Sequence, residues 1–124
     1  MQPADLRVLV IEDESDSALL MGSTLMYGGI QSWTASTGEQ ALEMMKEVNP
    51  NLLLVDLALP GMDGWEFLKQ VRANPTTARV LAVVISAYLT PAVAQQALKA
   101  GFRACFMKPV DTTSLVRQLL TLFD

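Results

Sequence analysis

The residues most able to do chemistry in this sequence are carboxylates that stand at the ends of apolar runs. Asp56 follows the run 52–55, and Glu12 and Asp13 follow the run 6–11. Because a buried carboxylate is costly as an anion, each of these groups needs a cation close by. Oxygen-only ligands suit Mg²⁺, which takes one or two carboxylates together with water and phosphate oxygens. The pattern therefore indicates a magnesium site.

Two further apolar runs end in groups that can bind a phosphoryl oxygen. Ser86 follows the run 80–85, and Lys108 follows the run 104–107. A lysine ammonium is a compact charge suited to a phosphoryl group, and a serine hydroxyl can donate to one of its oxygens. In an open parallel sheet the carboxyl ends of the strands share one edge, where ligands bind. The four strand ends together predict a phosphoryl site on Asp56.

The elements that must position these groups alternate strand and helix five times. Short apolar runs bounded by turn residues are typical of strands buried on both faces of a parallel sheet. The predicted strands are 6–11, 30–35, 52–55, 80–85 and 104–107. The predicted helices run from 13–16 to about 27, over 38–48, 64–73 and 91–100, and from Asp111 or Thr112 through Phe123. This alternation predicts an α/β fold with one doubly wound parallel sheet.

Several polar residues at helix starts are assigned structural roles. Thr37 and Gln40 fit a capping box, and Pro91 fits a first helical position. Glu14 and Asp16 are expected to cap the first helix and favour its dipole. These assignments leave Glu12, Asp13, Asp56, Ser86 and Lys108 as the groups to be explained by chemistry.

Length and composition limit the classes of function. A chain of 124 residues is one domain's worth, expected to bury roughly two-thirds of its unfolded surface. A net charge of −4 disfavours direct binding to nucleic acid or an anionic membrane. No apolar run approaches the roughly 20 residues of a membrane span. One cysteine excludes an internal disulfide and fits a reducing cytosol, so a cytoplasmic location is expected. With no histidine, the chain cannot be a histidine phosphodonor.

In these residues the chain resembles the response regulator receiver domain, the CheY-like phosphoacceptor module of two-component signalling. The matching pieces are Glu12-Asp13, Asp56 within VDLALPGMDG, Ser86-Ala87 and Lys108-Pro109, in the family's order and at its spacing. The match runs from about Leu6 to Phe123. The resemblance implies one domain over residues 1–124, with a core of about 6–123. It also implies a flavodoxin-like (βα)₅ fold with strand order 2-1-3-4-5.

The resemblance assigns a role to each site residue. Asp13, Asp56 and the backbone carbonyl of Ala58 are implied to hold Mg²⁺, with Glu12 acting mainly through a bound water. Asp56 is the implied phosphoacceptor, and Lys108 is implied to neutralise charge on the phosphoryl oxygens. Ser86 is then implied to move and to bond a phosphoryl oxygen. The Lys108–Pro109 peptide bond is typically cis in the family.

The implied partners are a sensor histidine kinase or a histidine phosphotransfer protein. The chain is expected to be a switch that catalyses its own phosphorylation and slow dephosphorylation, rather than a turnover enzyme. Its output is expected to run through the surface of the fourth helix, because Cys105 stands where receivers usually carry a mobile aromatic ring. Phe106 is expected to point to the opposite face. Ala58 and Tyr88 flank the expected path of the attacking water.

Three other interpretations remain open at this stage. A phosphohydrolase of the haloacid dehalogenase type also uses a strand-end Asp with Mg²⁺ and Lys, but it wants a second acid where Ala58 stands. A degenerate receiver that serves as a docking scaffold is disfavoured by the complete set of site residues. The chain could also be a receiver cut from a longer regulator or hybrid kinase.

Overall fold

The fold is built on a five-stranded parallel sheet. A computed structural model describes all residues from Met1 to Asp124. The strands lie in the order β2-β1-β3-β4-β5, which confirms the expected topology. Their bounds are β1 Arg7–Ile11, β2 Gln31–Ala35, β3 Leu52–Val55, β4 Leu81–Ser86 and β5 Ala104–Met107. Each predicted strand is therefore present, with ends shifted by at most one residue.

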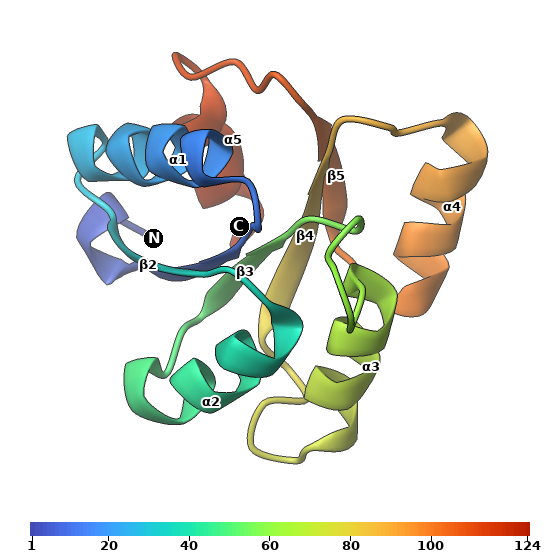
Figure 1. Ribbon diagram of the computed structural model, residues 1–124. Helices are drawn as coiled ribbons and strands as arrows, with labels where there is room; N and C mark the ends of the chain where they lie inside the picture. Colours follow the sequence, from blue (N-terminus) through green and yellow to red (C-terminus); the bar gives the residue numbers. More distant parts are fainter.

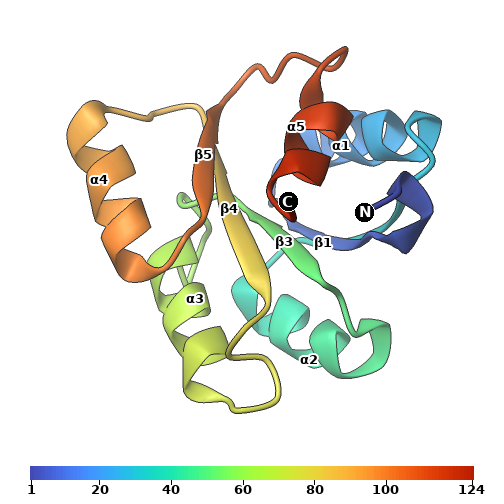
Figure 2. The ribbon, with the colours of Figure 1, turned by 180° about the vertical axis from the view of Figure 1, so that it is seen from behind.

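Five helices cover the two faces of the sheet (Figures 1 and 2). On one face lie α1 and α5, and on the other lie α2, α3 and α4. The helix bounds are α1 Ser15–Tyr27, α2 Gly38–Val48, α3 Gly64–Ala73, α4 Pro91–Ala100 and α5 Leu115–Thr121. A short 3₁₀ helix, Pro3–Asp5, precedes β1.

The central strand β3 contributes to both halves of the core. Leu53 and Val55 belong to the apolar cluster under α2, α3 and α4, while Leu52 and Leu54 belong to the cluster under α1 and α5. All four residues of β3 are buried. Because successive side chains of a strand point to opposite faces, a strand covered on both sides must be apolar throughout. This explains the uninterrupted apolar run before Asp56.

The start of α2 differs in one respect from the capping box predicted for it. The Thr37 hydroxyl accepts from the Gln40 N–H at 3.0 Å, as expected. The Gln40 side chain, however, accepts from the backbone N–H of Ser36 at 2.8 Å rather than from Thr37. The Gln40 side chain therefore bonds to the residue before the N-cap. Of the two bonds of a capping box, only the one to the Thr37 hydroxyl is formed.

The last helix begins later than the sequence suggested. Asp111 does not start α5; its carboxylate accepts from the N–H and hydroxyl of Thr113, at 3.0 and 2.6 Å, within a turn. The N-cap position is Ser114. An aspartate that accepts from the N–H two residues on closes a local turn through the same bond that an N-cap makes. The carbonyl of Asp111 accepts from the N–H groups of Ser114 and Leu115, at 3.2 and 3.0 Å, so residues 111–114 form a turn that leads directly into α5.

No helix in the structure has the length and apolar character needed to cross a membrane.

Candidate functional site

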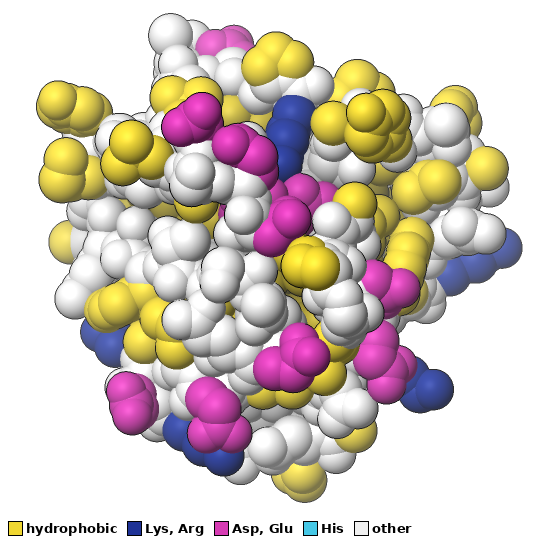
Figure 3. Space-filling model, viewed as in Figure 1, with side chains coloured by type: hydrophobic (Ala, Val, Ile, Leu, Met, Phe, Trp, Pro, Cys, Tyr) yellow, Lys and Arg dark blue, Asp and Glu magenta, His cyan; other side chains and the backbone are white.

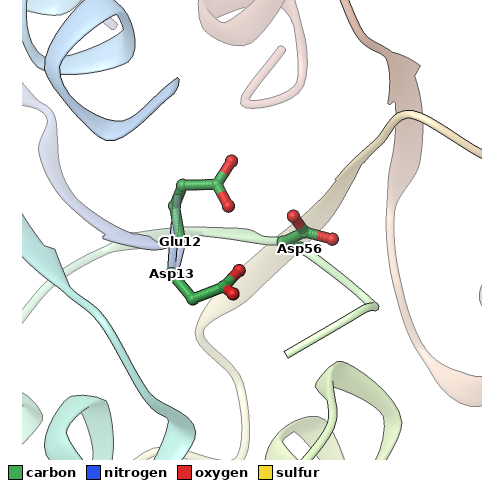
Figure 4. A group of neighbouring side chains, drawn as sticks. All are labelled: Glu12, Asp13 and Asp56. Carbon is green, nitrogen blue, oxygen red and sulfur yellow. The ribbon is translucent and has the colours of Figure 1, made fainter. Parts of the chain in front are cut away.

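Three carboxylates meet where β1 and β3 end. One oxygen from each of Glu12, Asp13 and Asp56 lies within 4.8 Å of the others (Figure 4). Both acids after β1 turn their carboxylates towards Asp56. Glu12 and Asp56 are buried, at 6 % and 8 % exposure, whereas Asp13 is exposed. The structure thus brings together the three acids that the sequence proposed as metal ligands.

Lys108 joins this group from the end of β5. Its ammonium forms ion pairs with Glu12 and with Asp56, the latter at 2.9 Å. Acidic side chains gather around one basic side chain in the upper middle of the face shown in Figure 3. One ammonium is shared by two buried carboxylates, so a charge imbalance is built into the site.

The pKa values of Glu12, Asp56 and Lys108 follow from this sharing. Burial raises the pKa of Glu12, and the Lys108 ammonium only partly opposes that effect. Burial also acts to raise the pKa of Asp56, but the hydrogen bond from the Ala58 N–H and the contact with Lys108 outweigh it, so its pKa is lowered. Burial acts to lower the pKa of Lys108, yet the two carboxylates raise it. Asp56 is therefore held as an anion and Lys108 as a cation.

Strand alternation explains why Glu12, Asp56 and Lys108 converge. Each one continues the row of side chains that points from its strand towards α1 and α5; the preceding members of these rows are Val10, Leu54 and Phe106. Asp13 follows the opposite parity, so it approaches Asp56 from the other side of the strand end. The geometry is set by residue parity on β1, β3 and β5.

Two features of the loop after β3 fix the position of Asp56. The Asp56 carboxylate accepts from the backbone N–H of Ala58 at 2.9 Å. A Cβ atom at Gly64 would lie 2.7 Å from the carbonyl oxygen of Asp56 and 2.8 Å from the Cα of Leu57. The first turn of α3 can therefore approach Asp56 only because residue 64 is glycine. Asp63, just before it, caps α3 by accepting from the Glu66 N–H at 2.9 Å.

Ser86 lies at the end of β4, between the strands that carry Asp56 and Lys108. It is buried, and its hydroxyl accepts from the Tyr88 N–H at 3.2 Å. Its backbone carbonyl accepts from the Lys108 N–H at 2.8 Å. The hydroxyl makes no hydrogen bond to the three charged side chains in this state. Ser86 is thus hydrogen-bonded to Lys108 through its backbone and to Tyr88, in the loop after β4, through its side chain.

The structure also places Tyr88, Cys105 and Phe106, which the resemblance singled out. Tyr88 is 84 % exposed, so its ring projects into solvent rather than over Asp56. Cys105 packs against the cluster under α2, α3 and α4, and Phe106 against the opposite cluster, as the strand period predicted. Burial raises the pKa of the Cys105 thiol. The Lys108–Pro109 peptide bond is cis, as the resemblance implied.

Three contacts at the site were not anticipated from the sequence. These are the Glu12–Lys108 ion pair, the Ala58 N–H bond to Asp56, and the close approach of Gly64. Each depends on side-chain reach or on backbone separation across a loop. The Pro60-Gly61 and Asp63-Gly64 steps are the local signals of a loop after Asp56.

Comparison with known proteins gives a family match over most of the chain. Residues 8–120 match the family described as response regulator receiver domain. The chain is 33% identical over 105 residues to a probable chemotaxis protein CheY of Rhizobium etli, which covers 84% of this chain and 81% of that protein. It is 30% identical over 119 residues to the sensor histidine kinase RcsC of Escherichia coli, covering 96% of this chain but 12% of the kinase.

A solved structure shows the same fold. The receiver domain of a sensor histidine kinase from Pseudomonas aeruginosa superimposes with a TM-score of 0.85 at 22% identity, covering 96% of this chain and 98% of that domain. That structure carries a magnesium ion coordinated in its active-site cleft. Sequences similar to this chain therefore occur both as most of a protein of about this size and as a small part of a long kinase.

Proposed function

Because the chain belongs to the family of response regulator receiver domains, we propose that it accepts a phosphoryl group on Asp56 and relays it as a two-component signal. The donor is a sensor histidine kinase or a histidine phosphotransfer protein. The chain itself has no histidine, so the phosphohistidine must come from the partner. We propose further that residues 1–124 form one receiver domain, which acts as a switch and not as a turnover enzyme.

The observation that carries this proposal is the pairing of a buried, ionised Asp56 with Lys108. The two are 2.9 Å apart, and Asp13 and Glu12 lie beside them. A purely structural ion pair has no need of two further acids at the same strand edge. An anionic nucleophile next to a fixed cation is what phosphoryl transfer requires, since that reaction depends on positioning and on neutralising charge.

The donor set fits Mg²⁺. Asp13 and Asp56 offer carboxylate oxygens, the backbone carbonyl of Ala58 lies two residues on, and Glu12 is placed to act through water. The Pseudomonas aeruginosa receiver domain, whose fold this chain shares, holds a magnesium ion in its cleft. When bound, the ion supplies positive charge to the phosphoryl oxygens. The exposed Asp13 leaves this side of the site open to ions from solvent.

Asp56, Lys108 and Ser86 each have a different role in the transfer. An Asp56 oxygen attacks phosphorus while the bond from phosphorus to the partner's imidazole breaks. The ring is protonated on its other nitrogen, so a mixed anhydride forms and a neutral histidine leaves. Lys108 moves from its carboxylate partners to the developing charge on the phosphoryl oxygens. Ser86 gives up its contact with the Tyr88 N–H and donates to a phosphoryl oxygen. That movement shifts the loop after β4 and, with it, α4.

The haloacid dehalogenase alternative loses its support at this point. The family match covers residues 8–120, and Ala58 supplies no second acid. The proposed chemistry also differs in its end state, because a receiver keeps the phosphoryl group long enough to signal.

Small phosphodonors test the proposed function and its metal dependence. Acetyl phosphate or phosphoramidate with Mg²⁺ is expected to add a single phosphoryl group, because these donors need only the metal and Lys108. EDTA is expected to abolish the addition, and excess Mg²⁺ to restore it. Intact-protein mass spectrometry measures the gain. Equal labelling in EDTA would contradict the metal assignment, and an acid-stable product would contradict an acyl phosphate.

A second prediction concerns the lifetime of the phosphoryl group. Ala58 has no polar group to orient an attacking water, and the exposed Tyr88 ring is free to close over the phosphorylated Asp56. Slow self-dephosphorylation is therefore expected. Ala58→Asn or Tyr88→Glu should each accelerate it by about tenfold, less than a full general base contributes. Loss of label over time measures the rate, with the exposed Ala92→Asn on α4 as control. If both site variants match the parent or hydrolyse more slowly, the shielding idea is wrong.

A third prediction concerns the output surface. Ala97 is the one buried residue of α4, so this helix is lightly anchored and can shift at small cost. Cys105 is too small to move as an aromatic ring does. Beryllofluoride, which mimics the phosphoryl group, should therefore change amide shifts mainly over residues 87–100, with Phe106 nearly unchanged. A still α4 together with a large Phe106 or Cys105 rearrangement in the NMR spectra or crystal structures would rule out this route.

A further inference from the structure

An apolar cavity lies directly under the charged cluster. It has a volume of about 300 Å³ and opens between α1 and the connection that follows β5. Its apolar wall is formed by Val10, Leu20, Met21, Leu54, Ile85 and Val110. The connection contributes Lys108, Pro109 and Val110 to the lining. The proposed phosphoryl chemistry uses none of these apolar residues.

The polar end of the cavity carries unbalanced charge. Glu12, Asp56 and Lys108 all line it, so two carboxylates face one ammonium. Glu12 and Asp56 are both buried residues, and their side chains are 6 % and 11 % exposed. Asp13 and Glu14, both exposed, add further negative charge at the same strand end. A single cation that reaches this end would offset the excess charge of the two buried carboxylates, whereas an anion would be repelled.

We propose that this cavity is a binding site for a small molecule with an apolar body and a single cationic end, such as an alkylammonium ion. The body would occupy the space between α1 and the connection after β5. The cationic end would lie against the carboxylates of Glu12 and Asp56. A volume of about 300 Å³ stands at the small end of ligand pockets, which suits a fragment-sized molecule.

Occupancy of this site competes with Mg²⁺, because both cations use the same carboxylates. That consequence rests on the proposed function, whereas binding of the apolar cation does not. The molecule would act as an inhibitor of phosphorylation that raises the Mg²⁺ concentration required. Alkylammonium binding and phosphorylation of Asp56 are therefore tested separately. Phosphorylation can occur in a chain that binds no alkylammonium ion, and an alkylammonium ion can bind to a chain that is not phosphorylated.

A series of matched probes tests the site on the full chain. Straight-chain alkylammonium ions from ethyl to heptyl are titrated without Mg²⁺ and followed by amide NMR shifts, beside alkanols and alkanoates of equal length. Each added methylene is expected to tighten ammonium binding about fourfold until the cavity is full. The ammonium should bind more tightly than the alcohol, and the alkanoate least. Mg²⁺ should weaken the ammonium far more than the alcohol.

Two variants of one helix separate this cavity from the acidic surface in general. Ser17 lines the cavity, whereas Ser23 lines a different groove beside β2. Ser17→Phe should fill the space and reduce heptylammonium binding at least tenfold, while Ser23→Phe should leave it unchanged. Far-UV circular dichroism checks both folds. If ethylammonium bound as tightly as heptylammonium, the apolar cavity would contribute nothing to binding. The site would then be only an acidic surface, which would overturn the proposal. Equal binding of alkanoates, or full binding by a folded Ser17→Phe chain, would also overturn the proposal.

Discussion

Substitution of Asp56 by Asn is expected to abolish phosphoryl uptake. The amide has the size of the carboxylate and can still accept the Ala58 N–H bond through its oxygen, so the loop should keep its shape. It lacks the anionic nucleophile, however, and it no longer attracts a divalent cation. With acetyl phosphate and Mg²⁺, the variant should show no mass gain under conditions that label the parent chain fully.

A matched control lies in the same loop. Asp63→Asn changes charge in the same way, seven residues further on, and Asn is as good a helix cap as Asp. This variant should label at the parent rate. Label retained in Asp56→Asn, or lost equally in Asp63→Asn, would show that the loop as a whole, and not the carboxylate of residue 56, decides uptake.

Replacing Lys108 with Met should produce the second large effect. Methionine preserves most of the side-chain length but leaves Glu12 and Asp56 buried without their shared cation. Loss of a preorganised charge at a developing oxyanion typically costs about 100-fold to 1,000-fold in rate, and a loss of that order is expected for labelling. Mg²⁺ should bind more tightly to the variant, because no ammonium competes for the carboxylates.

The opposite signs of these two effects make the prediction specific. Labelling rates with phosphoramidate and the Mg²⁺ dissociation constant are measured on the same preparation. Lys46→Met, whose ammonium pairs with Glu43 on the exposed face of α2, is the control and should change neither quantity. If Lys108→Met weakened Mg²⁺ binding as well as labelling, damage to the whole site would explain the result better than loss of one charge.

Much of the fold could be predicted because the sheet is covered on both faces. The runs 52–55 and 81–85 had to be apolar throughout, and their ends were marked by Asp56 and Ser86. Since parallel strands end on one edge, the convergence of acids, hydroxyl and ammonium followed from topology. Helices α2, α3 and α4 began and ended where Gly, Pro and Asn residues predicted.

The remaining details depend on distances that the sequence does not contain. The reach of Glu12 to Lys108 depends on two side-chain lengths across a strand edge. The need for glycine at position 64 comes from the close approach of α3 to the Asp56 carbonyl. The regular helix α5 begins at Leu115, after a turn that Asp111 closes through its bonds to Thr113. Each of these contacts depends on how the packed elements lie in space, which the sequence alone does not specify.

The most direct test of the central claim is to locate the phosphoryl group. The chain is treated with acetyl phosphate and Mg²⁺, reduced with borohydride, which converts an aspartyl phosphate to homoserine, and digested for tandem mass spectrometry. The proposed function predicts homoserine at position 56 alone, and none when EDTA replaces Mg²⁺. Homoserine at position 13 or 63 instead, or a phosphate that survives on Ser86, would contradict the assignment of Asp56 as the phosphoacceptor.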